Sequence, residues 1–251
     1  MNYLASFQDF FKSPKWTMNL LLGAVFSLIP FVGPMVLMGW LLHGFWGRSD
    51  ERAETFPDFT FDNFGKKLER GLWPTLVGLV GAVVVAPIAL IVMIVGMFVI
   101  GGAASATGSE DAAGGFAFLG MLMLGCVILL LALAVGFLMM PAVLRSALMQ
   151  DFGAGFHMAF VKRFLSLTKK ELALSMAFMG AATIVLIMIA LFPCIGFILV
   201  YLVIPPIHFA WMHLSKQLYA LYLSRGGEPV EISPKLSDDS PPLPPPAAPV
   251  V

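Results

Sequence analysis

Residues 72–104 read LWPTLVGLVGAVVVAPIALIVMIVGMFVIGGAA and contain no charged side chain. A helix needs about 20 apolar residues to cross the roughly 30 Å hydrocarbon core of a bilayer. Residues 116–144 form a second stretch of this kind, and the glycine-rich sequence GGAASATGSEDAAGG at 101–115 lies where the two meet. The pattern predicts a hairpin of two membrane-spanning helices over residues 72–144, with a loop at 101–115.

The composition of the whole chain also indicates a membrane protein. Apolar residues make up 59% of the 251 residues, whereas soluble domains contain about 45–50%. Charged residues make up only 12%, which is too few to give a globule of this size a soluble surface. Lys plus Arg and Asp plus Glu both total 15, so the formal net charge is zero. Nothing in this balance predicts a nucleic-acid partner.

Two further apolar stretches, residues 16–46 and 172–213, are each interrupted in the middle. The sequence IPFVGP interrupts the first at 29–34, and FPCIG interrupts the second at 192–196. Proline and glycine at this spacing favour a turn, so we predict helical hairpins over 16–46 and 172–217. Each arm of the first hairpin has only about 14–16 residues, which is short for a crossing. That hairpin therefore either crosses a thinned bilayer or is re-entrant.

The basic residues predict the orientation of the chain. All 15 lie outside the four apolar stretches, and none lies in the 101–115 loop. Because excess Lys and Arg mark the cytoplasmic face, we expect an inner-membrane protein with both termini in the cytoplasm. The fold expected for residues 1–224 is an all-α integral membrane bundle of about six membrane segments. Residues 225–251 are rich in proline and predict a disordered cytoplasmic tail, which acts as a spacer or binds a protein partner through PPLPPP at 241–246.

Three Phe-rich stripes precede the predicted hairpins and carry basic flanks. Phenylalanines spaced three or four residues apart share one helical face, which is typical of helices that lie in the lipid headgroup layer. We predict three cytoplasmic interfacial amphipathic helices, which contact the bilayer and its anionic lipids. The candidate lipid-interface residues are Phe7, Phe11, Trp16, Phe64, Lys66, Lys67, Trp73, Phe160, Lys162, Arg163 and Phe164.

The apolar stretches contain no Asp, Glu, Lys or Arg, and His43, His208 and His213 are the ionisable groups in or near them. Ion-coupled carriers usually place charged residues at this depth, so the sequence disfavours that class. The three histidines could form a metal site, but no carboxylate or Cys shares their expected depth. Polar contacts between helices are the favoured interpretation, and we expect no metal and no cofactor.

No enzyme motif is found in the sequence. There is no nucleophile elbow, P-loop or HExxH pattern. Asp9, Asp58 and Asp62 invite an acid–base interpretation, but neighbouring basic residues favour surface ion pairs or helix caps. Small residues four apart, at Gly78–Ala82–Ala86 and Ala132–Gly136, predict close packing of helix backbones in lipid. We therefore expect a protein that is not an enzyme.

Several short motifs resemble the prokaryotic membrane family called domain of unknown function 4013. They are Phe10–Phe11 before Trp16, the break at Pro30 and Gly33, Gly39, FPDF at 56–59, and Phe64 through Gly71–Leu72. Where the family has Gly-Tyr and Leu-Pro-Glu-Trp, this chain has Gly39–Trp40 and FPDF. The resemblance covers about residues 5–220 and implies a multi-pass membrane protein, with no activity attached.

Two functions fit these observations. The basic and aromatic residues favour a non-catalytic module that senses, scaffolds or shapes the bilayer. The alternative is a carrier, channel or flippase for a lipid-like or small uncharged substrate. Prolines at Pro30, Pro87 and Pro205–Pro206 motivate the alternative, because unwound helices can line a binding site.

Overall fold

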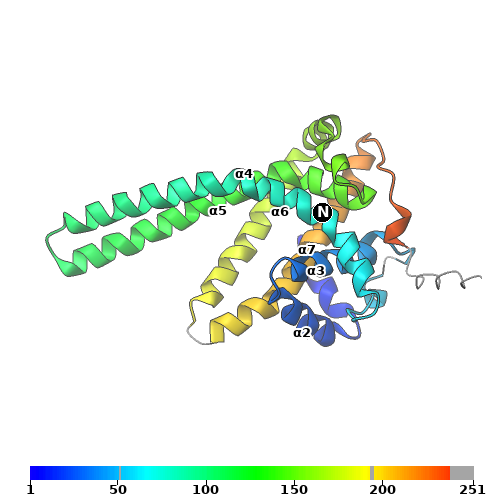
Figure 1. The fold of residues 1–251 in the computed structure, drawn as a ribbon, viewed down its shortest axis with the longest axis horizontal. Coiled ribbons are helices and arrows are strands. Elements are labelled where there is room, and N and C mark those ends of the chain that lie inside the picture. Colours follow the sequence, from blue (N-terminus) through cyan, green and yellow to red (C-terminus); the bar gives the residue numbers. More distant parts are fainter. Residues whose placement is uncertain (51, 193–194, 238–251) are drawn as a thin grey trace, which may run out of the picture.

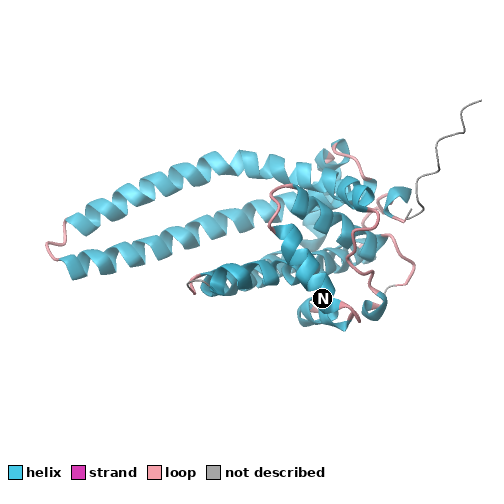
Figure 2. Cartoon of the chain, turned by 60° about the horizontal axis from the view of Figure 1, so that its bottom comes forward, coloured by secondary structure: helices cyan, strands magenta, loops and turns pink. Residues whose placement is uncertain are grey.

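The computed structural model describes residues 1–50, 52–192 and 195–237, and the regular structure in these ranges is helical, without strands (Figure 2). The α-helices are α1 (Tyr3–Gln8), α2 (Trp16–Ser27), α3 (Val32–Trp46), α4 (Phe64–Ser105), α5 (Glu110–Met149), α6 (Met158–Ala190) and α7 (Ile195–Ser224). Short 3-10 turns lie at Asp9–Lys12, Ala53–Thr55, Gly153–Phe156 and Pro234–Leu236.

Two hairpins project from a compact helical part, which we call the head (Figure 1). The head comprises α1, α2, α3, the ends of α4 to α7 nearest to them, and residues 226–237. Helices α4 and α5 form the longer hairpin, and α6 and α7 diverge from it as a second one. The projecting surfaces are apolar and exposed; Phe98 and Met123, for example, are 78% and 70% exposed. Such surfaces are stable where lipid covers them.

Four helices of the described chain are long and apolar enough to cross a membrane, namely α4, α5, α6 and residues 198–224 of α7. Helices α2 and α3 have only 12 and 15 residues, so the expected six crossings are not confirmed. The short first hairpin has an inner and an outer arm. Leu37, Leu41 and Leu42 of α3 are buried in the head, whereas Leu21 and Val25 of α2 are more than half exposed.

The prediction of a loop over residues 101–115 is wrong in its length. Helix α4 continues to Ser105 and α5 begins at Glu110, so the connection is only residues 106–109. The Ser109 side chain accepts a hydrogen bond from the Ala112 amide at 3.3 Å and caps α5. A membrane interior offers the backbone no hydrogen bonds, which favours helix even for glycines such as Gly101 and Gly102, whose helix propensity is low.

Two other local predictions differ from the structure. The second and third interfacial helices are the first turns of α4 and α6, continuous with the long apolar parts. The sequence predicted a bend or an unwound segment at Pro205 and Pro206, and α7 is continuous helix through both prolines. Pro205 is buried against Gly23 of α2, so tertiary packing stabilises this stretch of helix.

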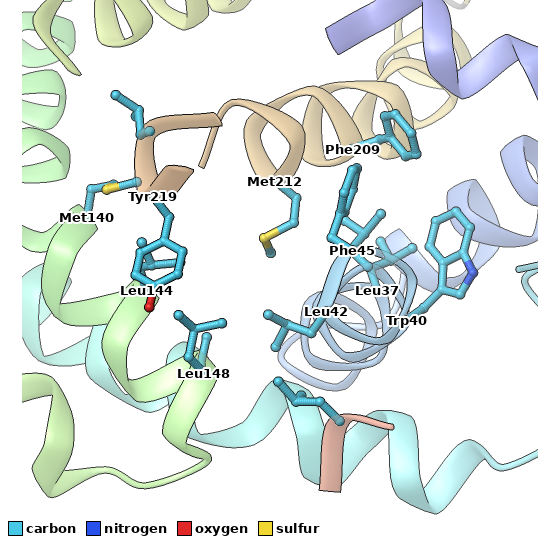
Figure 3. Packing of buried hydrophobic residues seen from close by; sticks show 14 of the residues in the cluster. Leu37, Trp40, Leu42, Phe45, Met140, Leu144, Leu148, Phe209, Met212 and Tyr219 are labelled. Atoms are coloured by element: carbon cyan, nitrogen blue, oxygen red, sulfur yellow. The ribbon is translucent and has the colours of Figure 1, made fainter. Parts of the chain in front are cut away.

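The FPDF motif belongs to the head core. Phe56 and Phe59 are buried, and their rings lie 5.4 and 5.1 Å from the Trp40 ring. Trp40 is 1% exposed, and its indole N–H donates to the Pro57 carbonyl at 2.9 Å. Figure 3 shows Trp40 of α3 within the buried cluster that α3, α5 and α7 share. The motif therefore anchors the α3–α4 connection on α3.

Helices α3 and α4 cross with their backbones in contact. A Cβ atom added to Gly39 would overlap the Lys67 carbonyl, and one added to Gly71 would overlap the Met35 carbonyl. A methyl group at either position would force the two backbones apart, so the two glycines permit this close crossing.

Residues 226–237, which we call the strap, return across the head after α7. The Val230 amide donates to the Tyr219 hydroxyl at 2.8 Å, and the Ser233 amide donates to the Leu148 carbonyl at 2.8 Å. Val230 is 8% exposed. The strap therefore joins α5 and α7 through hydrogen bonds that its backbone amides donate, one to a backbone carbonyl and one to a side-chain hydroxyl.

The end of the strap also reaches α3 and α4. The Leu236 carbonyl lies 2.8 Å from Nδ1 of His43, and Arg70 Nε donates to the Lys235 carbonyl at 2.8 Å. The Leu236 side chain is fully buried. The chain is thus ordered well beyond residue 225, where disorder was expected to start, and residues 238–251 with PPLPPP lie outside the described residues.

Candidate functional site

A cavity of about 610 Å³ lies between the two hairpins, next to the head. Helices α3 to α7 all contribute to its wall, and the cavity is open on one side. Small-molecule pockets in proteins occupy about 300–1,000 Å³. The volume is therefore sufficient for a ligand.

Small residues on α4 and α5 make room for the cavity. Gly78, Ala82, Ala86, Ala132 and Gly136 all line it. An added Cβ at Gly78 would meet no atom within 4 Å, and one at Gly136 would meet only Met176, at 3.6 Å. These are the residues predicted to bring helix backbones together. The structure instead leaves space beside them.

Methionines cover much of the remaining wall. Six line the cavity, from four helices: Met38, Met139, Met140, Met176, Met179 and Met212. Methionine side chains are flexible and polarizable, and they adapt to apolar ligands of different shape. Nothing in the sequence distinguishes them from ordinary core residues, which is why sequence analysis missed this site.

Polar groups in the cavity wall are few. The Ser215 hydroxyl donates to the Trp211 carbonyl at 2.8 Å, so its proton is not available to a ligand. His208 Nδ1 lies 3.0 Å from the Ile204 carbonyl. Among the described lining residues there is no Asp, Glu, Lys or Arg. The wall suits an apolar or uncharged occupant.

The three histidines lie in different places. His208 lines the cavity, His43 contacts the strap, and His213 stacks on the Phe45 ring at 5.6 Å. His213 Nδ1 also lies 3.7 Å from a carboxylate oxygen of Asp9. Within the described ranges, no three His, Cys, Asp or Glu residues are arranged to hold a metal ion. The structure therefore does not bring the predicted histidines together.

The predicted lipid-interface residues fall into three groups. Phe11, Phe64, Lys162 and Arg163 are exposed, and Phe7, Trp16, Lys66 and Trp73 are partly exposed. Lys67, Phe160 and Phe164 are buried, so the prediction that they contact lipid headgroups is wrong.

The three buried residues have partners inside the protein. Lys67 Nζ donates to the carbonyls of Thr60 and Asp62 at 2.6 and 2.8 Å. The Phe160 and Phe164 rings lie 5.4 and 5.1 Å from the Tyr222 ring. The stripe on α6 thus packs on α7. Its apolar periodicity was correctly identified, but its partner is distant in sequence.

The acidic residues weighed as catalytic groups form ion pairs or are exposed. Asp58 lies 2.8 Å from Lys15 and Asp9 lies 2.7 Å from Lys12. The hydrogen bond to Asp58 raises the pKa of Lys15. Asp62 is exposed. The ion-pair interpretation holds for Asp58 and Asp9, which lie outside the cavity wall.

Comparison with known proteins gives the family of the chain. The family described as protein of unknown function DUF4013 matches residues 22–201, and the chain belongs to it. The match extends from α2 into α7 and includes most of the cavity wall. No curated protein and no solved structure matches the chain.

Proposed function

We propose that the protein is a non-catalytic membrane module that binds a lipid or another elongated apolar molecule. The cavity is the observation that carries this proposal. Its wall belongs mainly to the four helices that are long and apolar enough to cross a membrane, and the hairpins that border it diverge beyond the head (Figure 1). A lipid chain has direct access to such a space from the hydrocarbon layer.

The charge distribution supports an orientation for this module. Lys162 and Arg163 are exposed at the start of α6, on the head side, whereas the first turn of α5, next to the α4–α5 connection, carries Glu110 and Asp111. We propose that the head faces the cytoplasm and the turn faces the opposite side. The exposed basic residues would then lie next to anionic lipid headgroups.

A carrier for a small uncharged or lipid-like molecule is the second candidate. The open cavity between two diverging hairpins favours it, because movement of one hairpin against the other would change access. The sparse polar lining supports a lipid-like cargo over a water-soluble one. Flux of a fluorescent lipid in proteoliposomes separates the two candidates, since a binding module gives none.

Photolabelling tests the binding proposal. The purified full chain is irradiated with a hexadecyl diazirine, and labelled peptides are mapped by mass spectrometry. We expect label on α5 and α7 at the cavity, and loss of most of it in Gly78→Leu, which fills open space. Gly125→Leu is the matched control, because Gly125 is exposed on α5 with no atom near its Cβ position. Equal labelling of the Gly78 variant and wild type would overturn the proposal.

A further inference from the structure

His208 is the ionisable residue in the described wall of the cavity. Its Nδ1 lies 3.0 Å from the Ile204 carbonyl, one helical turn earlier in α7. A carbonyl oxygen only accepts hydrogen bonds, so Nδ1 carries the proton. In a neutral imidazole the other nitrogen, Nε2, is then an acceptor.

In the part of the chain that the structure describes, no donor reaches the Nε2 atom of His208. His208 makes its hydrogen bond through Nδ1, and no residue in the described ranges donates to Nε2. His208 is partly exposed and lines the cavity, and Nε2 is not among the described side-chain atoms that are fully buried without a partner. An isolated charge in such apolar surroundings would be costly, so the ring is neutral.

This acceptor restricts the chemistry of the ligand. A phosphate or an ionised carboxylate would find no Lys or Arg in the described lining, and an ammonium group would find no carboxylate. A plain hydrocarbon would leave the acceptor unpaired, which is unfavourable in an apolar site. An uncharged O–H group satisfies Nε2 without introducing a charge.

We infer that the cavity binds a single apolar chain that ends in an uncharged O–H group, as in a long-chain alcohol or a protonated fatty acid. The O–H donates to His208 Nε2, and the chain lies among the methionines and beside the small residues of α4 and α5. This inference rests on the proposed function and adds the chemical class of the ligand. It makes His208 a specificity-determining residue.

Competition against the hexadecyl diazirine tests the inference with the full chain. The competitors are hexadecanol, its methyl ether and hexadecane, which have similar chains but differ in the O–H donor. We expect hexadecanol to compete about tenfold better than the methyl ether, the size of one neutral hydrogen bond. Hexadecanoic acid below its ionisation pH should show the same advantage and above that pH should lose it.

Variants connect the preference to the residue. In His208→Phe the advantage of hexadecanol should disappear, whereas His208→Gln, which retains an acceptor, should keep part of it. Thr183→Ala is the control outside the cavity wall, because it removes a hydroxyl that donates to the Met179 carbonyl at 2.9 Å, and it should leave the preference intact. Gel filtration and the melting temperature of each variant verify folding.

The outcomes separate the two proposals. If hexadecanol, its methyl ether and hexadecane compete equally in wild type while Gly78→Leu still loses the label, the O–H preference is overturned and the binding function stands. A hexadecanol advantage that persists in a folded His208→Phe also overturns it. Labelling that Gly78→Leu does not reduce overturns the proposed function itself.

Discussion

Two glycines, Gly39 and Gly71, set the distance between α3 and α4 in the head. We expect Gly39→Ala to lower the free energy of unfolding by about 1–3 kcal/mol, since the new methyl group forces two packed backbones apart. The measurement is the melting temperature of the detergent-solubilised protein. Gly65→Ala is the control, because it adds the same methyl group in α4 with no atom within 4 Å. Similar melting temperatures for both variants would contradict this account of the crossing.

Asn19 is a polar residue buried in the head, 2% exposed. Its carbonyl oxygen accepts from the Phe59 amide at 2.7 Å, and its amide nitrogen lies 3.4 Å from the Ser13 hydroxyl. Asn19→Leu should destabilise the head by about 1–3 kcal/mol, because the Phe59 amide is left buried without an acceptor. Thermal unfolding should show no such loss for Thr17→Ala, an exposed change in the same helix.

At the scale of the elements, the accessibility of single cysteines to a reagent added on one side of the membrane distinguishes four membrane crossings from six. In a chain with Cys126→Ala and Cys194→Ala, single cysteines replace Lys162, Thr107 and Ile29. A membrane-impermeant maleimide added to one side of sealed vesicles should label positions 162 and 107 from opposite sides. Position 29, at the end of a helix with only 12 residues, should be labelled from neither. Labelling of positions 29 and 107 from the same side would show that α2 and α3 cross.

The long helices could be predicted from the sequence, but several of their boundaries could not. The length of the uncharged stretches identifies α4 to α7, because a helix satisfies the hydrogen bonds of all its backbone groups within one segment in lipid. The predictions of helix boundaries failed where the preferences of single residues differ from what the surrounding structure favours. Glycines near residue 101 indicated a loop, yet they remain helical. Pro205 indicated a bend or an unwound segment, yet the helix continues through it and Pro205 packs on Gly23, a contact that sequence spacing does not reveal.

At the scale of the whole molecule, the cavity depends on how two hairpins diverge from one head. The small residues at Gly78 and Gly136 were visible in the sequence, and close packing was the reasonable prediction for them. Whether such a stripe meets another helix or an open space depends on the angle between distant elements. His208 was identified as a polar residue near the membrane, but its place in the cavity wall required the fold.

The buried side chains of the strap lead us to expect that it stabilises the head. Leu236→Ala should lower the free energy of unfolding by about 2–5 kcal/mol, because it removes a fully buried side chain. Ile232→Ala changes a 44% exposed residue in the same strap and should have little effect. The comparison is made by thermal unfolding. If both variants melt at the wild-type temperature, the strap is not part of the folded core.

The strap also has a consequence for biosynthesis. Residues 226–237 are synthesised after every helix that they join, so α3, α4, α5 and α7 exist before their last shared partner. During this interval the Leu148 carbonyl and the Tyr219 hydroxyl lack the backbone amides that later donate to them. The packing of the head is therefore completed only after its helices have been synthesised, and a chain that ends before residue 226 lacks the contacts that join α5 to α7.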